Sequence, residues 1–301
     1  MKKLTAVSAA ALTLLTITPA AAGAADTYTE NGVTYEYTVS GGKAVITSAN
    51  GAKGEVTIPA EIDGNAVTAI GAGAFFGATE LGAAILPEGL ESIGDSAFMG
   101  CLHITEITIP DSVTSIGKGS FMSCTDLTSV TVGAGITEIP EECFYSCPEL
   151  ETVQLPEGLL KIGAEAFFSC PELEITVPES VTEIGENALG MQSDARTGGV
   201  TNVLGFLIYG TSGSSAEQYA EKNGIDFLDP DNYITGDING DSFINASDAS
   251  EALAEYSRAS TGAPLQFTKK QRIIGDMDSD GFINATDASE ILAIYAHLST
   301  Q

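Results

Sequence analysis

The chain has 301 residues, of which 44% are hydrophobic, so it is long enough to form two domains with real hydrophobic cores. Acidic residues outnumber basic residues by 41 to 12, which gives a formal net charge of −29. Because nucleic acids and anionic membrane surfaces would repel such a protein, we set aside a nucleic-acid-binding role.

Residues 1–24 have the features of a secretory signal peptide. Two lysines precede an apolar run over residues 4–17, and the small residues Ala22 and Ala24 fit an A-x-A cleavage site. The run is shorter than the roughly 20 residues needed to span a bilayer, and no other stretch is long and apolar enough. We therefore predict a mature protein that begins near Ala25, is secreted and has no membrane span.

Residues 25–58 contain two runs of alternating side chains. Apolar residues recur at every second position from Val33 to Val39, and a second run covers residues 44–47 after Gly41 and Gly42. Alternation with a period of two, interrupted by a pair of glycines, is typical of a β-hairpin. We expect this hairpin to form a β cap on the domain that follows.

A repeat of 23 residues organises the domain that we assign to residues 59–228. Four columns of apolar residues keep this spacing, with a step of 22 at Ile184, Leu189 and Val177. The columns are Ile70, Ile93, Ile116, Ile139, Ile162 and Ile184; Phe75, Phe98, Phe121, Phe144, Phe167 and Leu189; Leu81, Ile104, Leu127, Leu150 and Leu173; and Leu86, Ile109, Val132, Leu155 and Val177. One coil cannot bury these side chains alone, so successive coils must stack roughly 4.8 Å apart. The repeat predicts a solenoid.

Each coil repeats the same local pattern. Residues 127–132 alternate as a half-buried strand, a Gly or Pro then turns the chain, and a short segment such as residues 136–139 precedes a helical turn around Phe144. Segments such as residues 109–117 resemble the BspA-like class of leucine-rich repeats, and the resemblance extends over about residues 30–228. It implies an α/β leucine-rich-repeat solenoid with a parallel β-sheet.

The same resemblance implies a scaffold that binds a protein or surface ligand, and it supplies no catalytic residues. The chain departs from the pattern at Gly133, where other coils have proline, and near Glu174, where one residue is lost. After the last coil, residues 205–209 and 225–228 are predicted strands, and residues 214–222 a predicted amphipathic helix. Such an atypical ending is what a terminal cap requires.

Four of the five cysteines form a column at the repeat spacing, and the fifth, Cys143, lies one helical turn before a column member. The column is Cys101, Cys124, Cys147 and Cys170. We favour buried thiols that pack as small hydrophobes. A disulfide within this group and a metal site remain open as alternatives.

The outward positions of the predicted strands carry no aromatic side chain. They are Glu106, Thr108, Ser129, Thr131, Thr152, Gln154 and Thr176. Sugar rings bind largely on flat aromatic faces, and the chain has no Trp, so this face suits protein contact better than polysaccharide binding. His103 occupies a position that is acidic in the next two coils and is expected at the surface. With two histidines and no Gly-x-Ser-x-Gly motif, nucleophilic hydrolysis has no support.

Residues 229–235 form a short predicted linker that Pro230 stiffens, so the two modules should lie close together. The second module, residues 236–301, contains two 12-residue segments in which oxygen-bearing side chains alternate. The expected metal ligands are Asp237, Asn239, Asp241, Phe243 through its carbonyl, Asn245 and Asp248, and then Asp276, Asp278, Asp280, Phe282 through its carbonyl, Asn284 and Asp287. Alternating oxygen ligands closed by a carboxylate on the following helix suit Ca²⁺. We predict two calcium ions.

The final ligand in both loops is Asp, whereas the standard EF-hand uses Glu. We expect a helix to follow each loop, ending near Tyr256 and Tyr295, but no helix to precede either loop. The sequences at 243–251 and 282–290 resemble the type I dockerin module, closest to the variant of cellulosome-forming ruminal anaerobes. This resemblance covers roughly residues 233–299 and implies a small all-α module whose partner is a cohesin module of a scaffoldin.

In related dockerins the two residues before the closing Asp help to choose the partner. Here they are Ala246 with Ser247 and Ala285 with Thr286, nearly identical and 39 residues apart. We expect either half to present the same surface to a cohesin after a half-turn of the module. The alternative is that both hydroxyl groups merely cap their own helices.

The combined expectation is a secreted, non-catalytic, calcium-binding protein that is associated with the cell surface through a cellulosome. Its solenoid would engage an unknown protein or surface ligand. Two other functions remain open: a dockerin-borne enzyme of plant polysaccharide degradation with an unrecognised active site, and a surface adhesin.

Overall fold

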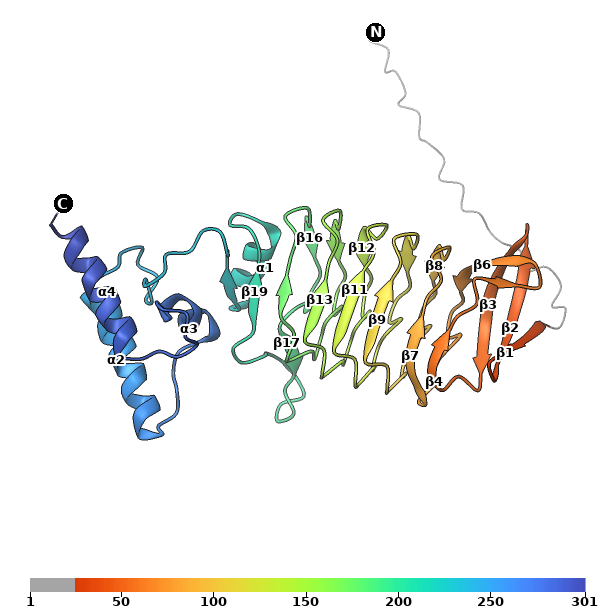
Figure 1. Cartoon of the computed structure of the whole chain (residues 1–301), viewed down its shortest axis with the longest axis horizontal. Coiled ribbons are helices and arrows are strands. Elements are labelled where there is room, and N and C mark those ends of the chain that lie inside the picture. The colour runs from red at the N-terminus through yellow and green to blue at the C-terminus, as the bar shows by residue number, and fades with distance from the viewer. Residues whose placement is uncertain (1–24, 301) are drawn as a thin grey trace, which may run out of the picture.

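The computed structural model describes residues 25–300, which form a long stack of β-coils with a helical module at its C-terminal end (Figure 1). The predicted signal peptide lies outside the described residues. The stack begins with β1 (Asp26–Glu30), β2 (Val33–Ser40) and β3 (Lys43–Asn50), which pair in antiparallel order. The expected hairpin is therefore present as β2 and β3, and β1 adds a third strand. Strand β3 then pairs in parallel with β6 and joins this cap to the solenoid.

Two series of short strands run along the solenoid. One series contains β4 (Gly54–Thr57), β7 (Leu81–Ile85), β9 (Glu106–Ile109), β11 (Ser129–Val132), β13 (Thr152–Gln154) and β15 (Ile175–Thr176). The other contains β6 (Asn65–Ile70), β8 (Ser92–Ile93), β10 (Ser115–Ile116), β12 (Glu138–Ile139), β14 (Lys161–Ile162) and β16 (Glu183–Ile184), and β5 (Glu61–Ile62) pairs antiparallel with β6. Like residues pair between coils, as in Ile107 with Val130 and Val130 with Val153. The predicted parallel solenoid is confirmed.

The phenylalanine column forms the centre of the core. Five rings, one from each of five successive coils, stack with centroid separations of 4.9, 5.3, 5.4 and 5.2 Å, close to the expected rise per coil. The rings belong to Phe75, Phe98, Phe121, Phe144 and Phe167, and all are buried. Stacked aromatic rings each remove a large apolar area from water, so this column is a major source of the solenoid's stability.

All five cysteines are free and buried, as the favoured interpretation expected. Each thiol of the column donates to the carbonyl of the stacked phenylalanine in the preceding coil. The pairs are Cys101 with Phe75 at 3.1 Å, Cys124 with Phe98 at 3.3 Å, Cys147 with Phe121 at 3.3 Å and Cys170 with Phe144 at 3.1 Å. Because a buried carbonyl needs a donor, the cysteines tie one coil to the next as well as filling space.

A C-terminal cap covers the last coil. It consists of β19 (Leu207–Tyr209), α1 (Ser215–Asn223) and β20 (Asp226–Leu228), in agreement with the sequence-based prediction. The structure adds an unpredicted antiparallel hairpin, β17 (Met191–Ser193) with β18 (Val200–Asn202). Its turn is held locally, because the carboxylate of Asp194 accepts bonds from the Arg196 amide and the Thr197 hydroxyl. Polar residues dominate this hairpin, so hydrophobic periodicity gives no sign of it.

The C-terminal module contains α2 (Ala246–Thr261), α3 (Lys269–Gly275) and α4 (Ala285–Leu298). Helices α2 and α4 lie side by side and enclose a small core with Ile238, Phe267 and Ile291 (Figure 1). The prediction that no helix precedes either loop is correct for the first loop and wrong for the second, which α3 precedes. A helix of seven residues is too short to show an amphipathic period in the sequence.

Helix α3 also joins the module to the solenoid. Ile274 is buried with Leu207 and Leu228 of the C-terminal cap, and Lys269 forms an ion pair with Glu174. These contacts and the short connection after β20 keep the two modules adjacent, as the length of the predicted linker suggested. No helix within residues 25–300 has both the length and the apolar character needed to cross a membrane.

Candidate metal centre

The first loop wraps around the carboxylate of Asp237. The two oxygens of this carboxylate accept the backbone N–H of Asp241 at 3.0 Å and of Ser242 at 2.8 Å. The side chains of Asn239 and Asp241 in turn accept backbone N–H groups two residues further on, at 2.9 Å each. Side chains at loop positions 1, 3 and 5 thus bend the loop by bonding its own backbone. Within residues 25–300, the carboxylates of Asp237, Asp241 and Asp248 are not among those whose oxygens all lie within 4.8 Å of one another.

The carboxylates that close the two loops are fully buried at the starts of α2 and α4. Asp248 accepts the amides of Asn239 at 3.2 Å and Asn245 at 2.9 Å, and Asp287 accepts those of Met277 at 2.8 Å and Asn284 at 2.7 Å. Each Asp completes a capping box with the Asn that begins its helix. These bonds and the helix N-termini stabilise the negative charge of both groups. They also fix the last ligand of each loop relative to the first.

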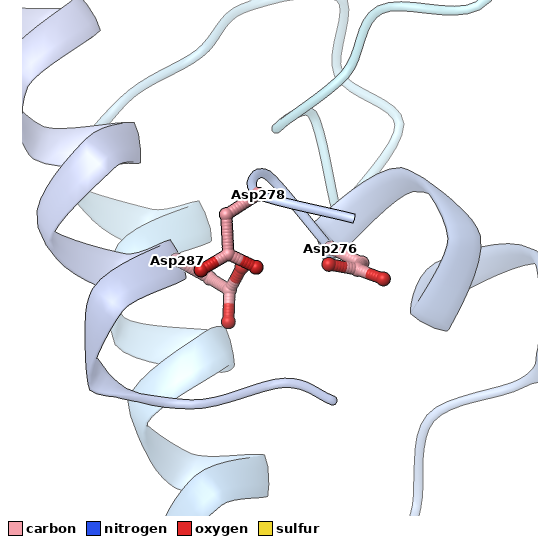
Figure 2. Close-up of side chains that lie close together, drawn as sticks. All are labelled: Asp276, Asp278 and Asp287. Carbon is pink, nitrogen blue, oxygen red and sulfur yellow. The ribbon is translucent and has the colours of Figure 1, made fainter. Parts of the chain in front are cut away.

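Three carboxylates of the second loop come together. Asp276, Asp278 and Asp287 each present an oxygen atom, and all three atoms lie within 4.8 Å of one another (Figure 2). The amide of Asp280 bonds both Asp276, at 3.1 Å, and Asp278, at 3.2 Å, so one backbone group holds two of the three side chains. The arrangement provides several oxygen ligands around one point, as a hard divalent cation requires.

The charges of this cluster repel one another. Burial raises the pKa of Asp278, and the neighbouring carboxylates of Asp280, Asp287 and Asp276 raise it further. Like charges held this close favour the protonated form, whereas a bound divalent cation would favour the ionised form. The cluster is therefore electrostatically suited to a cation.

The remaining predicted ligands lie around the same loops in different roles. The carboxylate of Asp280 accepts the Phe282 amide at 2.8 Å, and Asn284 contacts its second oxygen at 3.3 Å. In the first loop, Asn245 lies 3.3 Å from the Phe243 carbonyl, and its own side-chain oxygen caps α2. The Asp241 amide donates to both Asp237 and Asn239, and the Asn239 amide donates to Asp248. Phe243 and Phe282 are largely exposed, at 70% and 72%.

The two loops differ at position 6. Ser242 has a φ of 68° and Gly281 a φ of 84°, so both residues adopt the left-handed conformation that the sharp turn demands. A side chain at this conformation costs on the order of 1 kcal/mol, which the first loop bears and the second avoids. The two loops thus differ in backbone strain as well as in the number of ligand carboxylates, which is three in the first and four in the second.

The predicted partner-binding residues are all exposed. Ala246 and Ser247 lie in the first turn of α2, and Ala285 and Thr286 lie in the first turn of α4. The alternative was that these hydroxyls cap their own helices, and the structure does not support it. The cap is instead the preceding Asn: Asn245 accepts the Ser247 amide and Asn284 accepts the Thr286 amide, each at 2.7 Å. The hydroxyl groups therefore face solvent.

Sequence reasoning missed four exposed apolar residues on the same two helices. Leu253 and Tyr256 on α2 correspond to Leu292 and Tyr295 on α4, and each side chain is more than 40% exposed. The spacing of 39 residues that relates the calcium loops also relates these pairs. That repeat could have identified them, because a surface residue kept apolar in both halves points to a shared contact role.

Comparison with known families assigns both modules. Residues 66–194 match the family model for the BspA type leucine rich repeat region in six copies, and residues 235–293 match the dockerin type I domain. No curated protein matches the sequence significantly.

Several solved structures are similar to the solenoid. A leucine-rich repeat protein of T. pallidum is 23% identical, with 64% of this chain and 95% of that chain covered and a TM-score of 0.48. A leucine-rich cell surface protein of Faecalibacterium prausnitzii A2-165 is 22% identical (60% and 61% covered, TM-score 0.39), and one from Eubacterium ventriosum is 26% identical (54% and 48% covered, TM-score 0.42). The two family matches together show that the chain combines a BspA type leucine-rich repeat solenoid with a C-terminal type I dockerin domain.

Proposed function

We propose that this protein is a secreted, non-catalytic component of a cellulosome-type assembly, whose dockerin binds a cohesin module in a calcium-dependent way. A type I dockerin implies cohesin binding and calcium binding, and leucine-rich repeats suggest protein interaction. The observation that carries the proposal is the convergence of Asp276, Asp278 and Asp287 in a loop that the chain repeats 39 residues apart.

Two calcium ions would bind, one in each loop. The residues that would hold them are the six expected ligands of each loop, with the carbonyls of Phe243 and Phe282 at position 7. Bound calcium supplies positive charge that offsets three carboxylates in the first loop and four in the second. The backbone bonds that these carboxylates accept in the folded loops would orient them toward the ion.

The cohesin would bind along α2 and α4. Ser247 and Thr286 would supply hydroxyl groups, the adjacent alanines would permit close approach, and the exposed leucine and tyrosine pairs would supply apolar contact area. Because these groups recur at the same places in both halves, either half could face the cohesin.

The solenoid would bind a protein or surface ligand, while the dockerin attaches the protein to the assembly. Its first strand series presents exposed polar residues such as Glu106, Thr152 and Gln154, which gives a regular polar sheet suited to protein contact. No catalytic domain is evident within residues 25–300. The dockerin and the BspA type repeats both point to an extracellular or cell-surface setting, which supports secretion through the predicted signal peptide.

The test is binding of the full chain to immobilised type I cohesin modules, with calcium and with excess EDTA. We expect binding in calcium that chelation abolishes. Asp276→Asn and Asp237→Asn should weaken it, whereas Asp231→Asn, the same change on an exposed residue outside the loops, should not. Equal binding with and without EDTA would contradict the proposal.

A further inference from the structure

Helix α3 cannot be stable through its own hydrogen bonds. It has seven residues and one capping box, between Thr268 and Gln271, whereas isolated helices shorter than about 12–15 residues are marginal in water. Its stability must come from the surfaces on which it packs. The structure provides two such surfaces, on opposite sides of the helix.

One surface is the C-terminal cap of the solenoid. Ile274 is buried against Leu207 of β19 and Leu228 of β20, with Tyr209 and Ile273 at the margin of this small cluster. An ion pair between Lys269 and Glu174 adds a second contact, because Glu174 lies just before β15 in the last coil. Figure 1 shows α3 between the last strands of the solenoid and the α2–α4 pair.

The other surface is formed by the two calcium loops. A Cβ atom at Gly275 would lie 3.1 Å from Ile238 of the first loop and 3.2 Å from Ile283 of the second, so the helix backbone packs directly on both. The Ile274 carbonyl accepts the Gly236 amide at 2.8 Å, one residue before the first loop. Any movement of α3 would therefore reach the loops.

The second loop depends on α3 most directly. Asp276, its first ligand, is also the C-cap residue of α3, and its amide bonds the Arg272 carbonyl at 3.1 Å. The last turn of α3 therefore sets where this carboxylate stands relative to Asp278 and Asp287. If α3 frayed, the cluster would lose one of its three members.

We propose that the C-terminal cap of the solenoid is a docking partner of α3 and that this contact strengthens calcium binding in the second loop. The inference rests on the proposed calcium binding and adds that the solenoid raises the calcium affinity of the second loop. Docking holds α3 helical, so the ion need not order it on binding. Coupling of this kind is reciprocal, so calcium must also strengthen the docking of the dockerin on the cap.

The test is a calcium titration of the full chain labelled with ¹⁵N-glycine, in which the Gly281 amide reports the second loop and the Gly240 amide the first. Leu228→Ala and Glu174→Lys change only the solenoid. We expect Leu228→Ala to lower the affinity of the second loop about tenfold, within the range of coupled sites, and Glu174→Lys to lower it by up to about fivefold. Adding Lys269→Glu to Glu174→Lys should restore the affinity.

A matched control is Glu88→Lys, which makes the same charge change on an exposed residue between β7 and β8, away from the contact with α3. It should leave the Gly281 titration within about twofold of the unmodified chain. Hydrogen exchange gives the reciprocal measurement, because calcium should slow exchange in β19 and β20.

Two outcomes separate this inference from the proposed function. Unchanged Gly281 affinity in both Leu228→Ala and Glu174→Lys would overturn the coupling while leaving calcium binding intact. No calcium-dependent shift at Gly281 or Gly240 in the unmodified chain would instead contradict the proposed function.

Discussion

The ring of Phe121 lies 5.3 Å from the ring of Phe98, and the two planes are inclined by only 2°. Phe121 stacks in the same way on Phe144, at 5.4 Å, so it has an aromatic neighbour on both sides. A side chain in this position belongs to two coils at once. Its loss therefore affects the contact between coils more than a residue at an end of the column would.

We predict that Phe121→Ala lowers the free energy of unfolding by about 3–5 kcal/mol, because it removes a buried ring and leaves a cavity that two neighbours line. The measurement is denaturant unfolding followed by circular dichroism. Phe76→Ala is the matched control: its ring is 62% exposed, so the change should stay within about 0.5 kcal/mol. Similar losses for the two variants would show that stacking does not stabilise the solenoid.

The five cysteines should be unreactive in the folded protein. Burial raises the pKa of Cys101 to about 12 and also raises the pKa of Cys124, Cys143 and Cys147, so almost no thiolate is present at pH 8. We expect Ellman's reagent to label none of them in the native chain and all five in denaturant. Fewer than five in non-reducing denaturant would reveal a disulfide.

Removal of calcium should unfold much of the dockerin. Asp237, Asp241 and Asp248 in the first loop and four aspartates in the second repel one another without a cation. We expect EDTA to lower the helical circular dichroism signal, to which α2 and α4 contribute most, and to leave the β signal of the solenoid. A spectrum unchanged by chelation would contradict this prediction.

The second loop should bind calcium more tightly than the first. It has four ligand carboxylates against three, and it has Gly281 where the first loop has the strained Ser242. Ser242→Gly should therefore raise the affinity of the first loop about fivefold, since relief of left-handed strain amounts to roughly 1 kcal/mol. Calorimetric titration can measure both sites. Filling of the first site at lower calcium would reverse the assignment.

The two pairs that we propose contact the cohesin should substitute for each other. Replacing Ala246 and Ser247 with bulky charged residues, or Ala285 and Thr286, should leave cohesin affinity within about threefold, because the other half can still bind after a half-turn. Replacing both pairs should abolish binding in surface plasmon resonance. Loss of binding with Ser247→Ala or Thr286→Ala alone would mean that the dockerin has a single committed face.

The repeat could be predicted from the sequence because it is encoded locally. A column of phenylalanines 23 residues apart can be buried only by stacking. The spacing of the aspartates also pointed to the cluster that Asp276, Asp278 and Asp287 form, because side chains at alternate positions of one short loop need no distant residue to approach one another. The same reasoning correctly placed the cysteines in the core. It failed at the polar hairpin β17–β18, where no hydrophobic period exists.

Helix α3 and its position were decided only by tertiary structure. A helix of seven residues has too little local stability to give a recognisable pattern in the sequence. Helix α3 forms because Ile274 packs on Leu228 and Gly275 packs on Ile238. Leu228 lies 46 residues before Ile274 and Ile238 lies 37 residues before Gly275, beyond the reach of any local pattern. The sequence by itself thus determined which residues could bind calcium, and packing between the two modules determined how the first ligand of the second loop is held.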